Sequence, residues 1–502
     1  MRWRLRLAGW LAVWAALYTW QAVRLLPSPG VSRFNSPDEL ANHFFASRVA
    51  DGVPLPAPAP LQGGPGGIIH PRGMAVYHGN LVPLSFVGLP VWYGMLGRIF
   101  GKNAIIFLTP LLTVLGGWSF YVLLREWFDR RIASLAVLVV PLLPPWWYYA
   151  VRSMFHNLPF LAMFLAGVAI AVYERRQARI WRMAVAGGCL GGALTFRAVE
   201  AVWVLPLATA LVLATPALRK RWWAVALGAA LATLPVLAFQ AQTYGAFWQF
   251  GYLLPPAPSG GAVSRGIADL LPFGLHPRRA FQNVMAYGVT LLPWFAVPAL
   301  AGLALEVVRW RALDWRRRSY ALGYVLIAVW LTLYYGSAEI RDNVTPGVVS
   351  IGTAYVRYWL PLYVGGLPYV VLAFYFGLER WRQASLRRWV LAAALLLGGS
   401  VSIHLTWFSA DGLASVAQEI SAGEWKRLRV ERLLSAGAVI VTERADKVFF
   451  PNHPVVSSLT DPYVQRYLPQ LVDQRPVFYY TYFGDGAIDW AGADELRGVR
   501  LD

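Results

Sequence analysis

Long apolar runs, separated by short clusters of arginine, dominate the pattern of the chain. The first run covers residues 7–26, behind Arg2, Arg4 and Arg6. A helix needs roughly 20 apolar residues to cross a bilayer core. The segment resembles a signal peptide, but no small-residue cleavage site follows it, so we expect an uncleaved first helix. Ten further runs follow at residues 104–124, 132–150, 156–173, 182–197, 198–216, 222–241, 283–308, 320–337, 355–377 and 389–407.

The arginine clusters predict the topology. One cluster follows every second apolar run, and they lie at residues 125–131, 175–182, 219–221, 309–318 and 380–388. Cytoplasmic loops of membrane proteins carry an excess of lysine and arginine. With the basic N-terminus inside, all five clusters fall on the cytoplasmic side. We therefore predict an α-helical polytopic protein of the plasma membrane with about 11 transmembrane helices, a cytoplasmic N-terminus and an extracytoplasmic C-terminus.

Residues 81–100 are apolar and nearly long enough to cross, but counting them as a span would invert every later arginine cluster. Their two prolines and the Trp92-Tyr93 pair favour a position along the outer interface. The first outer loop is then predicted to extend from residue 27 to 103, with an irregular Pro/Gly-rich centre at residues 54–67. The longer loops lie outside, so we expect the chemistry there.

The last part of the chain differs in composition from the first 407 residues. From residue 408 to 502 the charge density rises, and an amphipathic stretch at 424–434 leads into GAVIVTE, which is typical of a buried strand. KVFF and PVFYYTYF, further along, are also predicted to be extended. We predict a transmembrane domain at 1–407 and a small extracytoplasmic α/β domain at 408–502.

Composition supports a membrane protein. Of the 502 residues 57% are hydrophobic and only 14% are charged, which is too apolar for a soluble chain of this size. The net charge of +19 would suit nucleic acid only if the basic residues shared one soluble face. They lie instead between apolar runs, so we assign them to topology and to contacts with membrane lipids, and expect no nucleic-acid partner. The single cysteine, Cys189, excludes an intrachain disulfide and a cysteine-based metal site.

Ser36, Pro37, Asp38 and Glu39 follow the first predicted span. Serine and glutamate three residues apart, with proline between them, are typical of a capping box that begins a helix, and Asp38 suits its first turn. The alternative is a catalytic acid pair. Adjacent residues of a helix point about 100° apart, so one base and one orienting partner is the most they can be. The two interpretations are compatible, since a helix start holds a carboxylate rigidly.

In the order of its features the chain resembles the GT-C superfamily of membrane glycosyltransferases that use polyprenyl-phosphate sugars. Examples are protein O-mannosyltransferases, aminoarabinose transferases and glycosyltransferase 39-like proteins. The resemblance covers about residues 1–407. It rests on the Asp38-Glu39 pair opening a long outer loop, on REWFDRR at 125–131, on the segment 148–157, on Thr195-Phe-Arg197 and on Arg357-Tyr-Trp-Leu-Pro361.

The resemblance implies transfer of a sugar from a polyprenyl-phosphate donor to an acceptor in the cell envelope, which is a lipid, a glycan or a protein. Asp38 matches the general base that takes a proton from the acceptor as it attacks the anomeric carbon, with inversion. Glu39 would orient the site or bind the acceptor.

Guanidinium groups suit the charge of the leaving phosphate. The donor-phosphate candidates are Arg152, Arg197, Arg278 and Arg357, with Arg279 beside them, and the substrate-binding candidates are His156, Glu200 and Tyr358. Two structural alternatives stay open. Arg197 and Glu200 could form an ion pair that only stabilises the turn between two spans, and Arg357 with Tyr358 could only anchor a helix at the membrane interface. Many relatives carry an acidic residue where this chain has His156, so a divalent cation stays open and no metal ligand is assigned.

A transporter or flippase of lipid-linked glycans is the alternative function. Transporters show internal duplication and broken helices in matching halves, and the sequence shows no such repeat. A permeation route also needs polar residues at mid-membrane depth, whereas the polar residues here gather at one face. A non-catalytic scaffold is a third alternative, in which Asp38 would be replaceable by asparagine.

Overall fold

The computed structural model describes residues 2–26, 34–175, 177, 179–254, 272–340, 342, 348–379, 383–457, 459 and 461–480. Packing divides the chain into two compact units, each assembled from three segments. Unit 1 comprises Met1–Ala22, Thr109–Thr233 and Arg265–Ser415, and unit 2 comprises Val23–Leu108, Leu234–Ser264 and Val416–Asp502. The predicted boundary at residue 407 is a different division and stays a prediction.

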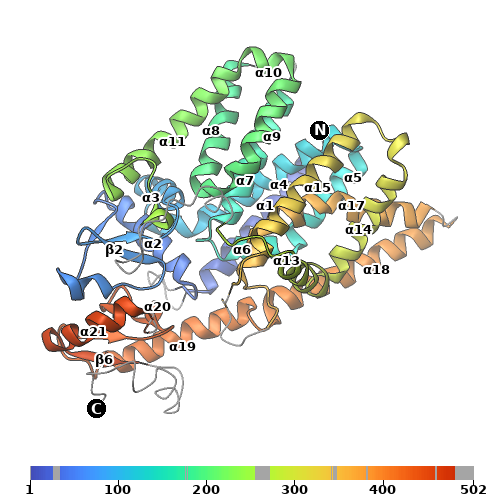
Figure 1. The fold of residues 1–502 in the computed structure, drawn as a ribbon. Helices are drawn as coiled ribbons and strands as arrows, with labels where there is room; N and C mark the ends of the chain where they lie inside the picture. The colour runs from blue at the N-terminus through green and yellow to red at the C-terminus, as the bar shows by residue number, and fades with distance from the viewer. Residues whose placement is uncertain are drawn as a thin grey trace. The chain divides into compact units, whose positions relative to one another are not determined.

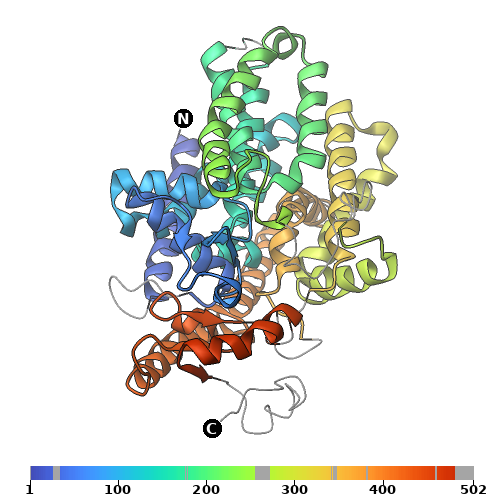
Figure 2. The same ribbon diagram turned by 60° about the vertical axis from the view of Figure 1, so that its left-hand side comes forward.

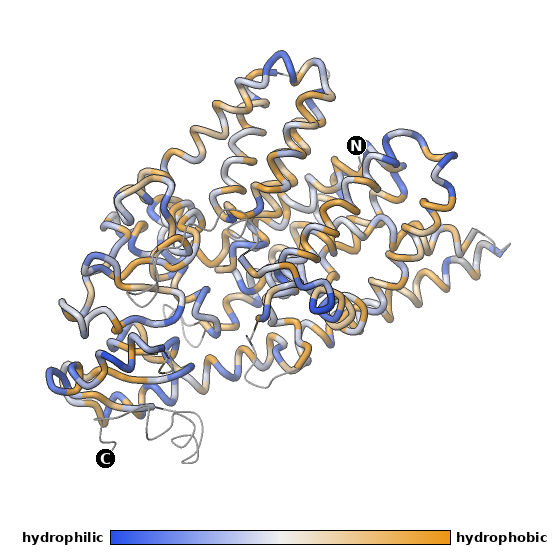
Figure 3. The backbone as a smooth tube through the Cα atoms, viewed as in Figure 1, coloured by the Kyte–Doolittle hydropathy of each residue, from blue (hydrophilic) through white to orange (hydrophobic). Residues whose placement is uncertain are grey.

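Unit 1 is built from apolar helices (Figures 1 and 3). Its longer helices are α1 (Arg2–Arg24), α4 (Leu108–Trp127), α5 (Arg130–Val139), α7 (Asn157–Tyr173), α8 (Ile180–Phe196), α9 (Ala201–Ala214), α14 (Pro293–Val308), α15 (Trp315–Gly336), α17 (Leu360–Glu379) and α18 (Ala384–Ile403). Helix α11 (Trp222–Tyr244) belongs to unit 1 up to residue 233 and to unit 2 from residue 234. Shorter segments are α6 (Pro144–Val151), α10 (Pro216–Lys220), α13 (Pro277–Asn283) and α16 (Ala354–Tyr358). Polar residues gather at the turns between them, and α17 packs against both α14 and α15.

Five helices are long and apolar enough to cross a membrane, and up to eight if each bent pair counts as one span, among the residues searched. The five are Lys102–Trp127, Trp222–Tyr244, Trp315–Gly336, Leu360–Leu378 and Arg388–Glu431. One bent pair, Ile180–Phe196 with Ala198–Ala214, meets at 119° and covers two of the predicted runs, 182–197 and 198–216. A membrane protein of many apolar helices is thus confirmed, whereas the count of 11 is not.

Unit 2 contains the first loop and the end of the chain. Helix α2 (Pro37–Ala50) packs against α3 (Gly88–Phe100), and β1 (Ala57–Pro58), β3 (Asn80–Pro83) and β2 (Met74–Tyr77) form an antiparallel sheet in that order. Helix α19 (Leu413–Glu431) leads into β4 (Val439–Val441), α20 (Asp446–Phe449), β5 (Val455–Val456), α21 (Pro462–Gln474) and β6 (Val477–Tyr479). Strand β4 pairs in parallel with β5 and β6.

The first loop and the chain end share one apolar core in unit 2. Ile68 and Ile69 of the loop are buried in a cluster with Val439, Val456 and Leu471 of the terminal segments. Both parts belong to unit 2, and Figure 2 shows them side by side, in blue and in red. The loop therefore completes the packing of the small parallel sheet, which buries apolar side chains from segments far apart in sequence.

Three local predictions in unit 2 have clear outcomes. Strand β4 lies within GAVIVTE, and residues 81–100 form β3 and the 13-residue α3, which is too short to cross a bilayer. The prediction that KVFF is extended is wrong, because its first three residues belong to α20. In PVFYYTYF, β6 is a strand and the residues from 481 on lie outside the described part.

Glycine allows α8 and α11 of unit 1 to approach to backbone contact. A Cβ at Gly187 would lie 1.9 Å from the carbonyl oxygen of Val225, and one at Gly228 would lie 1.8 Å from that of Ala184. Small residues commonly permit such approach between membrane helices, where van der Waals packing drives association. A side chain at Gly187 would therefore push the two helices apart.

We expect Gly187→Ala to lower the thermal unfolding temperature of the protein in detergent, because overpacking of this kind costs roughly 1–3 kcal/mol. Gly188→Ala is the matched control: its Cβ would lie 3.6 Å from the nearest atom, the carbonyl oxygen of Gly228, in ordinary contact. Equal unfolding temperatures for the two variants would contradict the backbone contact.

Candidate functional site

The acid pair lies at the start of α2 in unit 2. Ser36 is the N-cap, its side chain accepts the Asp38 N–H at 3.3 Å, and Pro37 occupies the first turn. The predicted helix start is therefore confirmed. Because the cap fixes the first turn, the backbone holds Asp38 and Glu39 in one orientation.

The two carboxylates differ in exposure. Glu39 is only 2% exposed, whereas Asp38 is partly exposed. His43, one helical turn after Glu39, packs its ring against Phe34 with 5.0 Å between centroids. Burial, together with the positive charge of Lys102, lowers the pKa of His43 to about 4. The imidazole is therefore neutral at pH 7, so α2 presents no histidine cation beside the acid pair.

Helix α20 contacts Asn35, the residue that precedes the N-cap of α2. Lys447 Nζ donates to both the backbone oxygen and the side-chain oxygen of Asn35, at 2.5 Å each. Phe450 packs edge-on against Phe44 of α2, with 4.9 Å between ring centroids. A cation from the end of the chain thus positions the start of the helix that carries Asp38 and Glu39.

A second contact ties the same segment to the first loop. Asp446 is fully buried and accepts from Arg72 through the backbone N–H at 2.8 Å, Nε at 3.0 Å and Nη2 at 2.6 Å. Forked pairing of this kind is geometrically specific. This long-range pair explains the helical start of α20, where the local pattern predicted a strand.

The predicted arginines of unit 1 gather in a buried cluster. Arg197 donates to Glu200 Oε1 at 3.0 Å and to the Tyr335 hydroxyl at 2.6 Å, and that hydroxyl donates to the same Glu200 oxygen at 2.7 Å. Trp203 Nε1 donates to the other oxygen, Oε2, at 2.5 Å. Arg197 is 6% exposed and Glu200 2%. The predicted Arg197–Glu200 ion pair is confirmed, and it is one part of a larger network.

Aromatic rings extend this network to two more arginines. The Arg197 guanidinium lies 4.9 Å from the Tyr358 ring centroid, and Arg357 lies 5.4 Å from the same ring. Arg357 also lies 4.6 Å from the Phe155 ring, which Arg152 approaches at 5.1 Å. Cations over aromatic faces are stabilised by the ring quadrupole, more so when desolvated. Three predicted arginines therefore form one continuous arginine–aromatic cluster.

The other predicted residues lie at the edge of this cluster or outside it. His156 is buried directly after Phe155, at the start of α7. Arg278 is exposed on α13, and no contact within the described part of the chain links it to the cluster. Asp342 accepts the Ala354 N–H at the start of α16, which also carries Arg357 and Tyr358. The cluster thus lies close to a second carboxylate.

Three contributors were not predicted, namely Phe155, Tyr335 and Trp203. Phe155 lies within the segment 148–157 that the resemblance singled out, and Tyr335 belongs to a Tyr-Tyr pair at the end of an apolar run. Tyrosine and tryptophan are common at both interfaces of membrane proteins, so the sequence does not distinguish Tyr335 and Trp203, which contact the cluster, from aromatic residues that only anchor the protein at the interface.

The described residues contain no group of three or more His, Cys, Asp or Glu side chains that could hold a metal ion. The arginine–aromatic cluster offers hydrogen-bond donors instead, because its three guanidinium groups present N–H groups in a buried environment lined by aromatic rings. Such an arrangement suits an anionic oxygen ligand.

No protein-family model matches the chain, and no curated protein matches its sequence. Solved structures match its fold. The archaeal oligosaccharyltransferase AglB from Archaeoglobus fulgidus, in complex with an inhibitory peptide and a dolichol-phosphate, is 14% identical, with a TM-score of 0.53 over 98% of this chain and 71% of AglB.

ArnT from Cupriavidus metallidurans matches with 14% identity and a TM-score of 0.51 when bound to undecaprenyl phosphate, over 94% of this chain and 90% of ArnT. Its apo state gives 13% identity and 0.51, over 93% and 89%. At such identities the likeness establishes the fold. The helical membrane fold that the resemblance implies is therefore confirmed, as a likeness of fold alone.

We expect Lys447→Met to speed amide hydrogen exchange in the first turn of α2 by about fivefold or more, because a hydrogen bond from a charged group contributes roughly 1.5–3 kcal/mol. Lys102→Met is the matched control, since Lys102 pairs with Asp51 at the opposite end of α2. Unchanged exchange at Leu40 in Lys447→Met would show that the contact with Asn35 does not position the helix start.

Proposed function

We propose that the protein is an integral membrane glycosyltransferase that transfers a sugar from a polyprenyl-phosphate donor to an extracytoplasmic acceptor. The buried arginine–aromatic cluster carries this proposal. Arg152, Arg197 and Arg357 are each less than a tenth exposed, although buried charges in a membrane bundle are costly and are rarely kept without a function. An anionic donor phosphate accounts for three such cations in one place.

The fold supports the same class of donor. The similar structures include one solved with a dolichol-phosphate and one bound to undecaprenyl phosphate. Both ligands join a long apolar chain to a phosphate, and a bundle of apolar helices with a buried arginine cluster suits both parts. We assign Arg152, Arg197 and Arg357 to the donor phosphate, and His156, Glu200 and Tyr358 to the surrounding site. Arg278 stays a prediction without a described contact.

We assign the general base to Asp38. In the proposed step the acceptor hydroxyl or amine loses its proton to Asp38, its lone pair forms the bond to the anomeric carbon, and the bond from that carbon to the phosphate oxygen breaks. The leaving polyprenyl phosphate carries the electron pair away, and the guanidinium groups stabilise its charge. A single displacement inverts the anomeric centre. The partial exposure of Asp38 and the burial of Glu39 favour Asp38 as base and Glu39 as the residue that orients the site.

We expect Asp38→Asn to lower kcat for sugar transfer in proteoliposomes by roughly 100-fold or more, because a positioned base typically contributes about 10²–10⁴-fold. Asparagine keeps the shape of the side chain and suits the first turn of a helix, so the fold should persist. Asp51→Asn makes the same change at the exposed end of the same helix and should retain activity. Full transfer by Asp38→Asn would overturn the mechanism.

Donor binding tests the arginine cluster separately. We expect Arg357→Gln to weaken binding of a polyprenyl-phosphate donor about tenfold or more, since charge-assisted contacts to phosphate are strong. Arg131→Gln removes the same charge from an exposed position on α5 and should leave donor binding unchanged. Unfolding temperatures measured in parallel separate lost binding from lost fold. Equal donor affinity in both variants would remove Arg357 from the site.

A further inference from the structure

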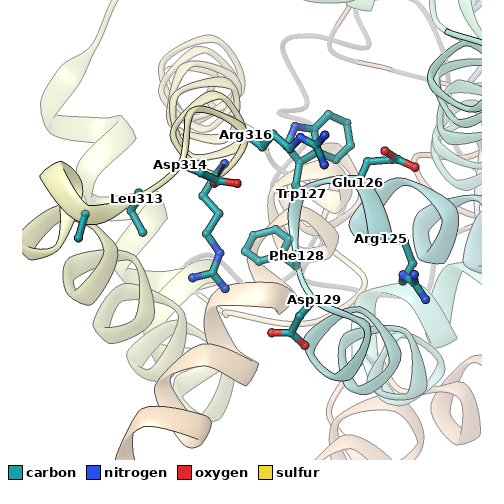
Figure 4. Close-up of a pocket in the computed structure, with 10 residues that line it drawn as sticks. Arg125, Glu126, Trp127, Phe128, Asp129, Leu313, Asp314 and Arg316 are labelled. Carbon is teal, nitrogen blue, oxygen red and sulfur yellow. Dashed lines mark hydrogen bonds between the residues drawn. The ribbon is translucent and has the colours of Figure 1, made fainter. Parts of the chain in front are cut away.

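A pocket of about 360 Å³ opens in unit 1 at a place that the proposed transfer reaction does not use (Figure 4). One wall is the turn between α4 and α5, residues 125–129, and the other is the loop into α15, residues 312–314, with Arg316 and Arg317. The segments 125–131 and 309–318 together carry eight arginines against three carboxylates. The surroundings of the pocket therefore have a marked excess of positive charge.

The carboxylates that line the pocket are already engaged. Glu126 pairs with Arg175 at 2.6 Å. Asp129 uses Oδ1 to accept two backbone N–H groups in the first turn of α5, at 2.7 and 3.0 Å, and Asp314 uses its Oδ1 to accept one at the start of α15, at 3.0 Å. Each acid is thus balanced by a cation or by the positive end of a helix.

The arginines that line the pocket are less engaged. Arg125 and Arg316 are exposed, on opposite walls, and neither has a carboxylate partner among the described residues. Arg317 has two partners: its Nη1 lies 3.5 Å from the Glu306 carboxylate, and its guanidinium lies 5.4 Å from the Phe128 ring centroid. Glu306 is 1% exposed, and its oxygens make no hydrogen bond within the described part of the chain. Arg317 is therefore paired with a buried acid, while Arg125 and Arg316 are exposed at the pocket.

We propose that this pocket binds the phosphate of an anionic phospholipid headgroup. Three guanidinium groups offer donors for phosphate oxygens, and Trp127 and Phe128 provide the aromatic side chains typical of membrane interfaces. Farther along α15, Leu322 and Leu326 are exposed, and such apolar side chains suit the acyl chains of a lipid better than a soluble phosphate. This site is independent of the proposed sugar transfer.

Lipid binding to the full chain, purified in a neutral detergent, tests the site by native mass spectrometry with phosphatidylglycerol. We expect Arg125→Gln/Arg316→Gln to weaken binding about tenfold or more. The matched control, Arg219→Gln/Lys220→Gln, removes the same charge from exposed positions on α10 and should change binding less than about twofold. Equal weakening in both double variants would mean general attraction and overturn the site.

Glu306→Gln separates an organised site from a charge effect. The substitution adds one net positive charge, so general attraction would tighten lipid binding, whereas the loss of the anchor for Arg317 weakens it. We expect weaker binding, by about threefold or more, with an unfolding temperature in lipid-free detergent close to that of the original chain, because the partly exposed Arg317 side chain can be hydrated when its partner is neutral. Tighter or unchanged binding would overturn the proposal.

The source of the phosphate is tested with two further probes. Diacylglycerol, which has no phosphate, should not bind in competition with phosphatidylglycerol, and inorganic phosphate should displace the lipid only at concentrations in the millimolar range or above. If inorganic phosphate stabilises the protein through Arg125 and Arg316 while phosphatidylglycerol does not, the lipid assignment is wrong.

Discussion

The structure of unit 1 depends on how it neutralises guanidinium groups inside an apolar bundle. Glu200 neutralises Arg197 and accepts hydrogen bonds from Arg197, Trp203 and Tyr335. It thereby joins the turn between α8 and α9 to α15. Removing one partner of a buried pair leaves an uncompensated charge, which costs roughly 3–5 kcal/mol. The network therefore constrains where α8, α9 and α15 meet, and with them the rings that hold Arg152 and Arg357.

Unit 2 also contains a buried charge, the carboxylate of Asp446, which is neutralised by an arginine distant in sequence. Asp446 gathers three donors from Arg72, 374 residues earlier in the chain, and so fixes the terminal segment against the first loop. Lys447, its neighbour, then reaches Asn35 at the entry to α2. The position of Asp38 thus depends on residues near the end of the chain, and the terminal segment has a structural part in any chemistry that Asp38 performs.

The sequence predicted what depends on neighbouring residues. The cap at Ser36, the Arg197–Glu200 pair and the apolar runs arise from spacings of a few residues, and all three appear in the structure. It could not predict Tyr335 as a partner of Glu200, 135 residues away, nor the helix at α20, whose start is held by Arg72. The number of transmembrane spans could not be predicted from the sequence either, because bends such as the one at Arg197 decide whether two apolar helices count as one span.

Burial separates two classes of arginine that look alike in sequence. Those at the turns, such as Arg125, Arg131 and Arg316, are exposed, and their charges cost little free energy because water or lipid headgroups can solvate them. Arg197 and Arg357 give up hydration, and hydrogen bonds and aromatic faces offset that loss only in part. A charge kept at such a cost needs a ligand or a structural task. Arg197 joins helices through Glu200 and Tyr335. Arg152 donates to the Tyr148 hydroxyl and meets Arg357 over the Phe155 ring, so these two arginines also take part in the packing of the cluster.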